Sequence, residues 1–246
     1  MVELWIQRLA EDFWQSAGAA EPLPRNLESH VLWALPVAVL KFPKLHLSEA
    51  RLWLAQRNMF GPDDGERELH ACLIAFAGRG LIFLDGTDPA DELRFSLAHE
   101  VGHFIIDYLV PRRTAVARFG SEIANVLDGI RPPTTQERGA AILSNTKIGV
   151  YRHMMTRTQS GEIGCPRIAE AENAADELAL ELLAPFELVQ KILVADLAPA
   201  QQSHRAVTKV LQEKFGLPNS LAVRYSFRFG PIDKKPKSVK QWLGIS

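Results

Sequence analysis

Residues 94–106 of this chain read RFSLAHEVGHFII, an apolar segment that contains the pattern H-E-x-x-H. Because an α-helix turns once every ~3.6 residues, His99 and His103 would lie on one face of a buried helix. Both imidazoles could then bind one metal ion, and zinc suits neutral imidazole ligands. Glu100 would point about 100° round the helix, where it can reach a water molecule beside the metal. We therefore favour a metal-binding helix over a pair of hydrogen-bonded core histidines.

A second helix could complete the metal site. Residues 168–183 read IAEAENAADELALELL and are followed by Ala-Pro. A zinc ion with two histidine ligands needs a third protein ligand, and a carboxylate from a separate helix is one solution. Glu172 and Asp176 lie four residues apart, so if Glu172 binds the metal, Asp176 can accept a hydrogen bond from a ligand histidine. The alanines at 171, 174, 175 and 179 would allow close packing. A solvated acidic surface helix remains the alternative.

Composition sets wide limits on function. The chain has 246 residues, of which 47% are hydrophobic and 23% charged, so it can form one or two ordinary globular domains. A net charge of −1 selects no class of partner. The first residues do not resemble a signal peptide, and no apolar run reaches the roughly 18 residues of a membrane span, so we expect a cytoplasmic protein. Cys72 and Cys165 are expected to be free thiols, and Cys165 is not expected to bind metal.

The segment before the H-E-x-x-H helix predicts a small sheet. We expect a helix over 2–17, a short helix that ends near residue 35, a strand over 36–42 and a helix capped by Ser48. Two strands, 70–76 and 81–84, would form a hairpin joined at 78–80, and Asp88 with Pro89 would start the metal-bearing helix. His70 is expected to be structural. The prediction is an α+β fold, with a small antiparallel sheet packed on helices.

Three regions follow from this pattern: an N-terminal helical region over 1–60, a central domain over 61–196 with an insertion over 111–166, and a C-terminal region over 197–246. The insertion contains one expected helix, 121–127, and more basic than acidic residues. That basic surplus fits either a solvated face or the edge of a cleft. Tyr151 and His153 lie in the insertion and could hydrogen-bond a developing oxyanion, but the sequence assigns neither of them a role.

The C-terminal region predicts helices over 187–194 and 199–215, and residues 207–225 have helix-turn-helix spacing. Basic residues outnumber acidic ones after residue 201. This favours a polyanion or an acidic partner surface, with weak DNA contact through 201–240 as one form. A paired-helix packing unit without DNA contact is the simpler interpretation. Residues 231–240 are expected to form a flexible tail.

Two segments together resemble the signatures of the ImmA/IrrE family of metallopeptidases. Residues 94–103, RFSLAHEVGH, are similar to R-F-T-L-A-H-E-L-G-H, and residues 172–185, ENAADELALELLAP, to E-x-x-A-N-x-F-A-x-x-L-L-M-P. The resemblance implies a zincin-like core of the gluzincin type, in which zinc binds His99, His103 and Glu172, and Glu100 is the catalytic acid/base. Asp176 takes the Asn position, which fits a supporting role. The packing residues at 178 and 184 differ, and the two signatures lie further apart than is usual.

The resemblance also implies a function. Members of this family are cytoplasmic zinc endopeptidases that cut one protein partner, typically a helix-turn-helix transcriptional repressor, and so regulate mobile-element or stress-response genes. We expect one Zn²⁺ per chain, although Mn²⁺ or Fe²⁺ could occupy the same ligands. Two alternatives stay open: a non-catalytic regulator that binds a repressor or DNA with a structural metal or none, and a zinc hydrolase that acts on a non-peptide amide.

Overall fold

The computed structural model describes residues 2–18, 22–57, 65–144, 148–157, 166–197 and 203–229. Contacts divide the chain into two compact units, Val2–Leu183 and Ala184–Ser246. This division differs from the sequence-based regions 1–60, 61–196 and 197–246. The N-terminal helices belong to the same unit as the two helices that are expected to bind metal, because α1 (Leu4–Ala17) packs on α8 (Pro166–Leu183). Cys165 and the expected tail over 231–240 lie outside the described residues.

The sheet of the first unit has four strands in the order β1-β3-β2-β4. They are β1 (Val37–Phe42), β2 (Leu69–Phe76), β3 (Arg79–Asp85) and β4 (Tyr151–Thr156). The predicted α+β class is confirmed, but the sheet is mixed: β2 pairs antiparallel with β3 and β4, whereas β1 pairs parallel with β3. A parallel pair needs a crossover connection, and α3 (Leu47–Ala55) lies in the connection that leaves β1.

The predicted hairpin is present, with a tighter turn than expected. Ala77 and Gly78 form a two-residue loop with φ of 47° and 77°, and Phe76 pairs directly with Arg79. Positive φ at both turn residues is the geometry that matches the twist of antiparallel strands. Strand β3 therefore begins at Arg79, two residues before the predicted start.

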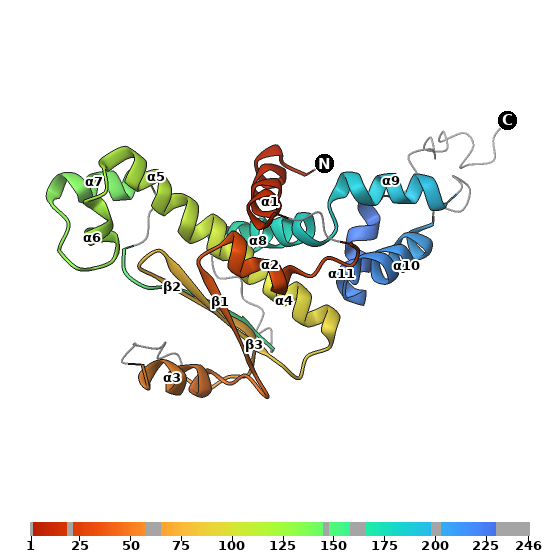
Figure 1. Cartoon of the computed structure of the whole chain (residues 1–246), viewed down its shortest axis with the longest axis horizontal. Helices are drawn as coiled ribbons and strands as arrows, with labels where there is room; N and C mark the ends of the chain where they lie inside the picture. Colours follow the sequence, from red (N-terminus) through yellow and green to blue (C-terminus); the bar gives the residue numbers. More distant parts are fainter. Residues whose placement is uncertain are drawn as a thin grey trace, which may run out of the picture. The chain divides into compact units, whose positions relative to one another are not determined.

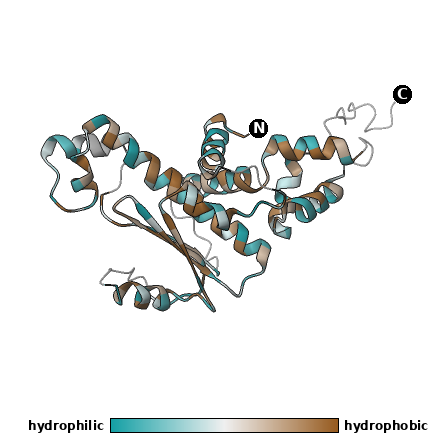
Figure 2. Ribbon diagram, viewed as in Figure 1, coloured by the Kyte–Doolittle hydropathy of each residue, from teal (hydrophilic) through white to brown (hydrophobic). Residues whose placement is uncertain are grey.

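Each face of the sheet packs against different helices (Figure 1). One face packs against α3 in a core cluster that includes Leu47, Leu54, Cys72, Ile74 and Phe83. Helix α4 (Ala90–His103) contacts β2, β3 and β4, and in Figure 1 it lies on the side of the sheet away from α3. The strands are mostly hydrophobic ribbons in Figure 2, as a sheet covered on both faces requires.

Helix α3 begins one residue before the predicted cap. Its N-terminal flanking residue is His46, in extended backbone and without a side-chain cap. The Ser48 hydroxyl instead donates to Glu66 Oε1 at 2.9 Å. The predicted cap at Ser48 is therefore wrong, because a partner distant in the sequence engages the hydroxyl.

Helices α4 and α8 approach each other closely. A Cβ atom added to Gly102 would lie 2.9 Å from the Ala175 carbonyl oxygen and 3.0 Å from its Cα atom. Ala175 and Ala179 are buried, so the expectation that small residues on α8 permit close packing is confirmed. Two N-terminal side chains hold the end of α8: Trp14 Nε1 donates to the Leu182 carbonyl oxygen at 3.2 Å, and Arg25 donates to the same oxygen at 2.9 Å.

The segment after α4 is more ordered than its sequence pattern predicts. It continues as a π-helix (Phe104–Leu109), α5 (Val110–Phe119), α6 (Ile123–Leu127) and α7 (Thr135–Ser144) before β4. The predicted helix over 121–127 corresponds to α6. Part of the basic surplus is paired within the segment: Arg112 lies 2.6 Å from Asp128, and Arg131 lies 2.6 Å from Glu137.

The second unit is helical in its described part. Its elements are α9 (Phe186–Asp196), α10 (His204–Phe215), α11 (Asn219–Ser226) and a 3₁₀ turn (Phe227–Phe229). Gly216, with φ of 63°, ends α10, so residues 207–225 do form helix, glycine turn and helix. Tyr225 donates to the Ala184 carbonyl oxygen at 3.1 Å.

The remaining helix of the first unit is α2, which spans Leu27–Ala34. None of the helices in the described residues is long and apolar enough to cross a membrane.

Candidate metal centre

The H-E-x-x-H pattern forms the C-terminal end of α4. The Nε2 atoms of His99 and His103 lie 3.1 Å apart, and the two residues are 3% and 1% exposed. Successive turns of one helix therefore present both imidazoles to the same point, as the four-residue spacing predicts.

Glu172 of α8 faces this pair of imidazoles. Its Oε2 lies 3.3 Å from His99 Nε2, and its Oε1 lies 3.6 Å from His103 Nε2. Ligand atoms of a tetrahedral zinc ion, at bond lengths of 2.0–2.1 Å, are about 3.3 Å apart. The spacing of the three donor groups thus fits one such ion.

His153 joins the cluster from β4, and sequence reasoning did not assign it there. Its Nε2 lies 3.0 Å from Glu172 Oε1. One ligand atom from each of His99, His103, His153 and Glu172 lies within 4.8 Å of the others, so these four residues could hold a metal ion. Strand pairing explains the position: His153 lies opposite Leu73 and Tyr151 opposite Ala75. Alternation along β4 turns both side chains toward α4, away from the face that Met154 shares with the α3 cluster.

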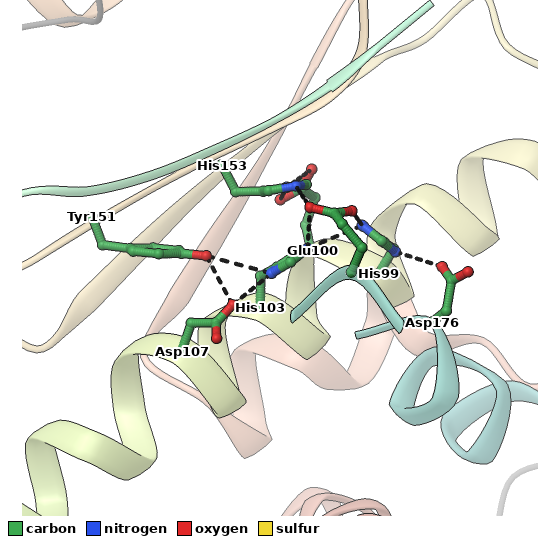
Figure 3. A network of polar contacts seen from close by, with 8 residues as sticks. His99, Glu100, His103, Asp107, Tyr151, His153 and Asp176 are labelled. Carbon is green, nitrogen blue, oxygen red and sulfur yellow. Dashed lines mark hydrogen bonds and ion pairs between the residues drawn. The ribbon is translucent and has the colours of Figure 1, made fainter. Parts of the chain in front are cut away.

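A carboxylate holds the second nitrogen of each histidine in the cluster (Figure 3). The Nδ1 of His99 lies 2.9 Å from Asp176, and the Nδ1 of His103 lies 2.7 Å from Asp107. The Nδ1 of His153 lies 2.9 and 3.0 Å from the two oxygens of Glu100. Asp176 therefore lies where its predicted supporting role requires. Asp107 was missed, although its position four residues after His103 is a signal that helical spacing could have used.

Tyr151 supports this arrangement from β4. Its hydroxyl donates to Asp107 Oδ2 at 3.0 Å, and it lies 3.4 Å from His103 Nδ1. Burial, followed by the charge of Asp107, raises the pKa of Tyr151 well above its ordinary value. The phenol therefore stays protonated and acts as a hydrogen-bond donor to Asp107.

The pKa values in the cluster show a strong negative field. Burial lowers the pKa of His99, but hydrogen bonds to Asp176 and Glu172 outweigh it and raise the pKa to about 9. Burial acts in the same direction on His153, and the charge of Glu100 with its hydrogen bonds raises that pKa to about 10. For Glu172 and Glu100, burial raises the pKa, but the neighbouring histidines lower it below its ordinary value. A site that binds protons this tightly also favours a metal cation.

Two other residues considered from the sequence lie outside the cluster. His70 Nδ1 lies 2.8 Å from Asp88 Oδ2, and Asp88 also accepts from Arg157 at 2.6 Å. This agrees with the structural role expected of His70. Cys72 is a free, buried cysteine in the core cluster beside α3, and burial raises the pKa of its thiol.

Comparison with known proteins does not identify a family for this chain. No protein-family model matches the chain, and no curated protein matches its sequence.

Proposed function

We propose that this protein is a zinc-dependent endopeptidase that cleaves a specific protein partner. The observation that carries the proposal is the meeting of His99 and His103 with Glu172 from a separate helix, at spacings that suit one tetrahedral ion. Neutral imidazoles with one carboxylate are a donor set that zinc prefers, although manganese or iron could also bind. The resemblance to the ImmA/IrrE signatures supports the same ligands.

Different residues of the site would perform different steps of peptide hydrolysis. A bound zinc ion would polarise the scissile carbonyl and acidify an attacking water molecule. Glu100, one residue from His99, is the general base for that water and returns the proton to the leaving amine. Asp176 and Asp107, which lie against the Nδ1 atoms of the two helix histidines, would favour the tautomer that leaves Nε2 for the metal.

The proposed substrate is a transcriptional repressor of the helix-turn-helix class. This part of the proposal rests on the family resemblance alone. Cleavage of such a repressor would regulate stress-response or mobile-element genes, and it would take place in the cytoplasm.

A non-catalytic regulator with a structural metal is the second candidate. The position of His153 favours this second candidate. His153 adds a fourth donor to the cluster, and its contact with Glu100 engages the proposed base. Structural zinc sites use four protein ligands, whereas catalytic sites keep one position open.

The first test is metal content. Elemental analysis of the purified wild type is expected to find about one zinc per chain, with a large loss in Glu172→Ala. Glu170→Ala, an exposed position on the same helix, is the matched control and should retain zinc. Full zinc retention in Glu172→Ala would refute the three-ligand site.

The second test is cleavage. New protein N-termini should appear in cells that express the wild type or His153→Ala. They should be absent with Glu100→Gln, which removes the base but keeps a hydrogen-bond acceptor for His153. If wild type and Glu100→Gln produce the same N-termini, Glu100 has no part in catalysis. If the wild type and His153→Ala both bind zinc and neither produces new N-termini, the structural-metal candidate replaces the peptidase.

A further inference from the structure

The geometry points to His153 as a fourth protein ligand, which closes the metal centre and keeps the enzyme latent until His153 leaves. This inference rests on the proposed function, because it concerns the same ion and the same Glu100. It adds a regulated state to the centre, and it gives Glu100 a second role.

His153 has the two features of a metal-binding histidine. Its Nε2 faces Glu172 at 3.0 Å, and its Nδ1 lies on a carboxylate, that of Glu100. The same pairing occurs at His99 with Asp176 and at His103 with Asp107. Histidine ligands almost always donate their second N–H in this way. Three equivalent imidazole–carboxylate pairs therefore surround the position that Glu172 also faces.

Glu100 is engaged by His153 rather than exposed to a substrate. It is fully buried, with 0% exposure, and both of its oxygens lie within 3.0 Å of His153 Nδ1. A general base must lie within hydrogen-bond reach of the water that it deprotonates. While His153 remains in place, Glu100 orients an imidazole; once His153 leaves, the carboxylate is free to act on water.

Four protein ligands fill a tetrahedral ion and leave no position for water. The rings of His103 and His153 are stacked with centroids 3.7 Å apart. Two imidazoles on one tetrahedral ion have centroids about 5 Å apart, so ligation moves the His153 ring outward by about an ångström. The hydrogen bond to Glu100 can persist during this shift, because either carboxylate oxygen can accept it.

The element that carries His153 differs from those that carry the other ligands. His99, His103 and Glu172 lie on two packed helices, whereas His153 lies on β4, an edge strand of the sheet, which pairs with β2. An edge strand has one ladder of hydrogen bonds, and such elements open locally at lower free energy than packed core helices. His153 is therefore the ligand that can leave while the other three keep the ion.

Cobalt spectroscopy tests this inference on the full-length chain. We would load wild type, His153→Ala and Arg152→Ala with Co²⁺ and titrate each with azide while recording visible absorption. Arg152 is the matched control, because it is the adjacent, exposed residue on β4. The wild-type and Arg152→Ala spectra should stay unchanged, whereas the His153→Ala spectrum should shift as azide enters the open position. The cobalt dissociation constant of His153→Ala should rise at least about 10-fold.

A second variant keeps the test decisive if His153→Ala fails to fold. Glu100→Ala should weaken cobalt binding about 10–100-fold, because it removes the carboxylate that orients a ligand. A wild-type spectrum that shifts with azide as readily as that of His153→Ala would overturn the closed centre and leave the open peptidase site intact. Unchanged cobalt affinity in both His153→Ala and Glu100→Ala would also overturn it. A wild type that binds no cobalt would overturn the proposed function together with this inference.

Discussion

At the scale of single residues, the proposed metal centre depends on carboxylates that are not themselves among the proposed ligands. Asp176 and Asp107 each hold the Nδ1 of a helix histidine, and Tyr151 donates to Asp107. Since an imidazole free to rotate or to change tautomer is a weaker ligand, these acids contribute to affinity through the histidines that they orient.

We therefore predict that Asp176→Ala and Asp107→Ala each raise the zinc dissociation constant about 10–100-fold without removing a ligand. Competition with a chelator of known affinity would measure the zinc dissociation constants. Tyr151→Phe should have a smaller effect, because Asp107 keeps its bond to His103. If both aspartate variants bind zinc as tightly as the wild type, the histidines are held by other contacts.

Asp85 is the residue whose effect on fold stability should depend most clearly on pH. Its side chain accepts from Arg157 at 2.6 Å and from the Leu45 backbone N–H at 3.1 Å, and it is 1% exposed. Burial raises its pKa, but hydrogen bonds from Thr87, Arg157 and Leu45 lower it well below the ordinary value. A lowered pKa means that this carboxylate stabilises the fold above the unfolded-state pKa of about 3.9, and that the stabilisation is lost as pH falls.

Asp85→Asn should lower the free energy of unfolding by about 3 kcal/mol at pH 7, because it leaves Arg157 without part of its charge partner. At pH 3 the difference in unfolding free energy between wild type and variant should be about 1 kcal/mol smaller than at pH 7. Urea unfolding of the metal-free proteins at both pH values would measure it, with the exposed Asp12→Asn as control. A gap that widens on acidification would reverse the assigned direction of the pKa shift.

At the scale of elements, the contact between α4 and α8 brings the ligands together. Gly102→Ala would place a Cβ atom against the Ala175 backbone, so we expect a loss of about 1–3 kcal/mol in unfolding free energy and weaker zinc binding. Thermal unfolding and a zinc titration would measure both effects. Gly139→Ala, in α7 with open space around its added Cβ, is the control. Adding Ala175→Gly should restore little, because backbone atoms make the closest contacts.

The elements also show which parts of the site the sequence can reveal. His99 and His103 lie within one helix, so their spacing alone brings them together, and Glu172 was found because two ligands implied a third. His153 could not be found in this way, because only the pairing of β4 with β2 turns it toward α4. Ser48 shows the same limit: local preference predicted a helix cap, but the hydroxyl bonds Glu66 across a loop.

At the scale of the whole molecule, the four residues that could hold a metal ion lie within one of the two compact units. His99, His103, His153 and Glu172 all belong to residues 2–183, whereas α9, α10 and α11 belong to the other unit. The helical unit has buried residues of its own, among them Leu211, Phe215 and Tyr225. Metal binding stabilises only those parts of a protein that must unfold to release the ion.

We therefore predict that zinc protects the two units unequally in hydrogen exchange. At a free zinc concentration of 100 times the dissociation constant, the stabilisation is about 2.7 kcal/mol, or roughly 100-fold slower exchange. Peptides from α4 and α8 should show this slowing, and peptides from α10 and α11 should exchange at the metal-free rate. Mass spectrometry of the full chain with and without zinc would resolve the peptides, and Glu172→Ala should show no change. Equal protection of α10 and α11 would mean that the two units unfold together, because release of the ion would then require the helical unit to open as well.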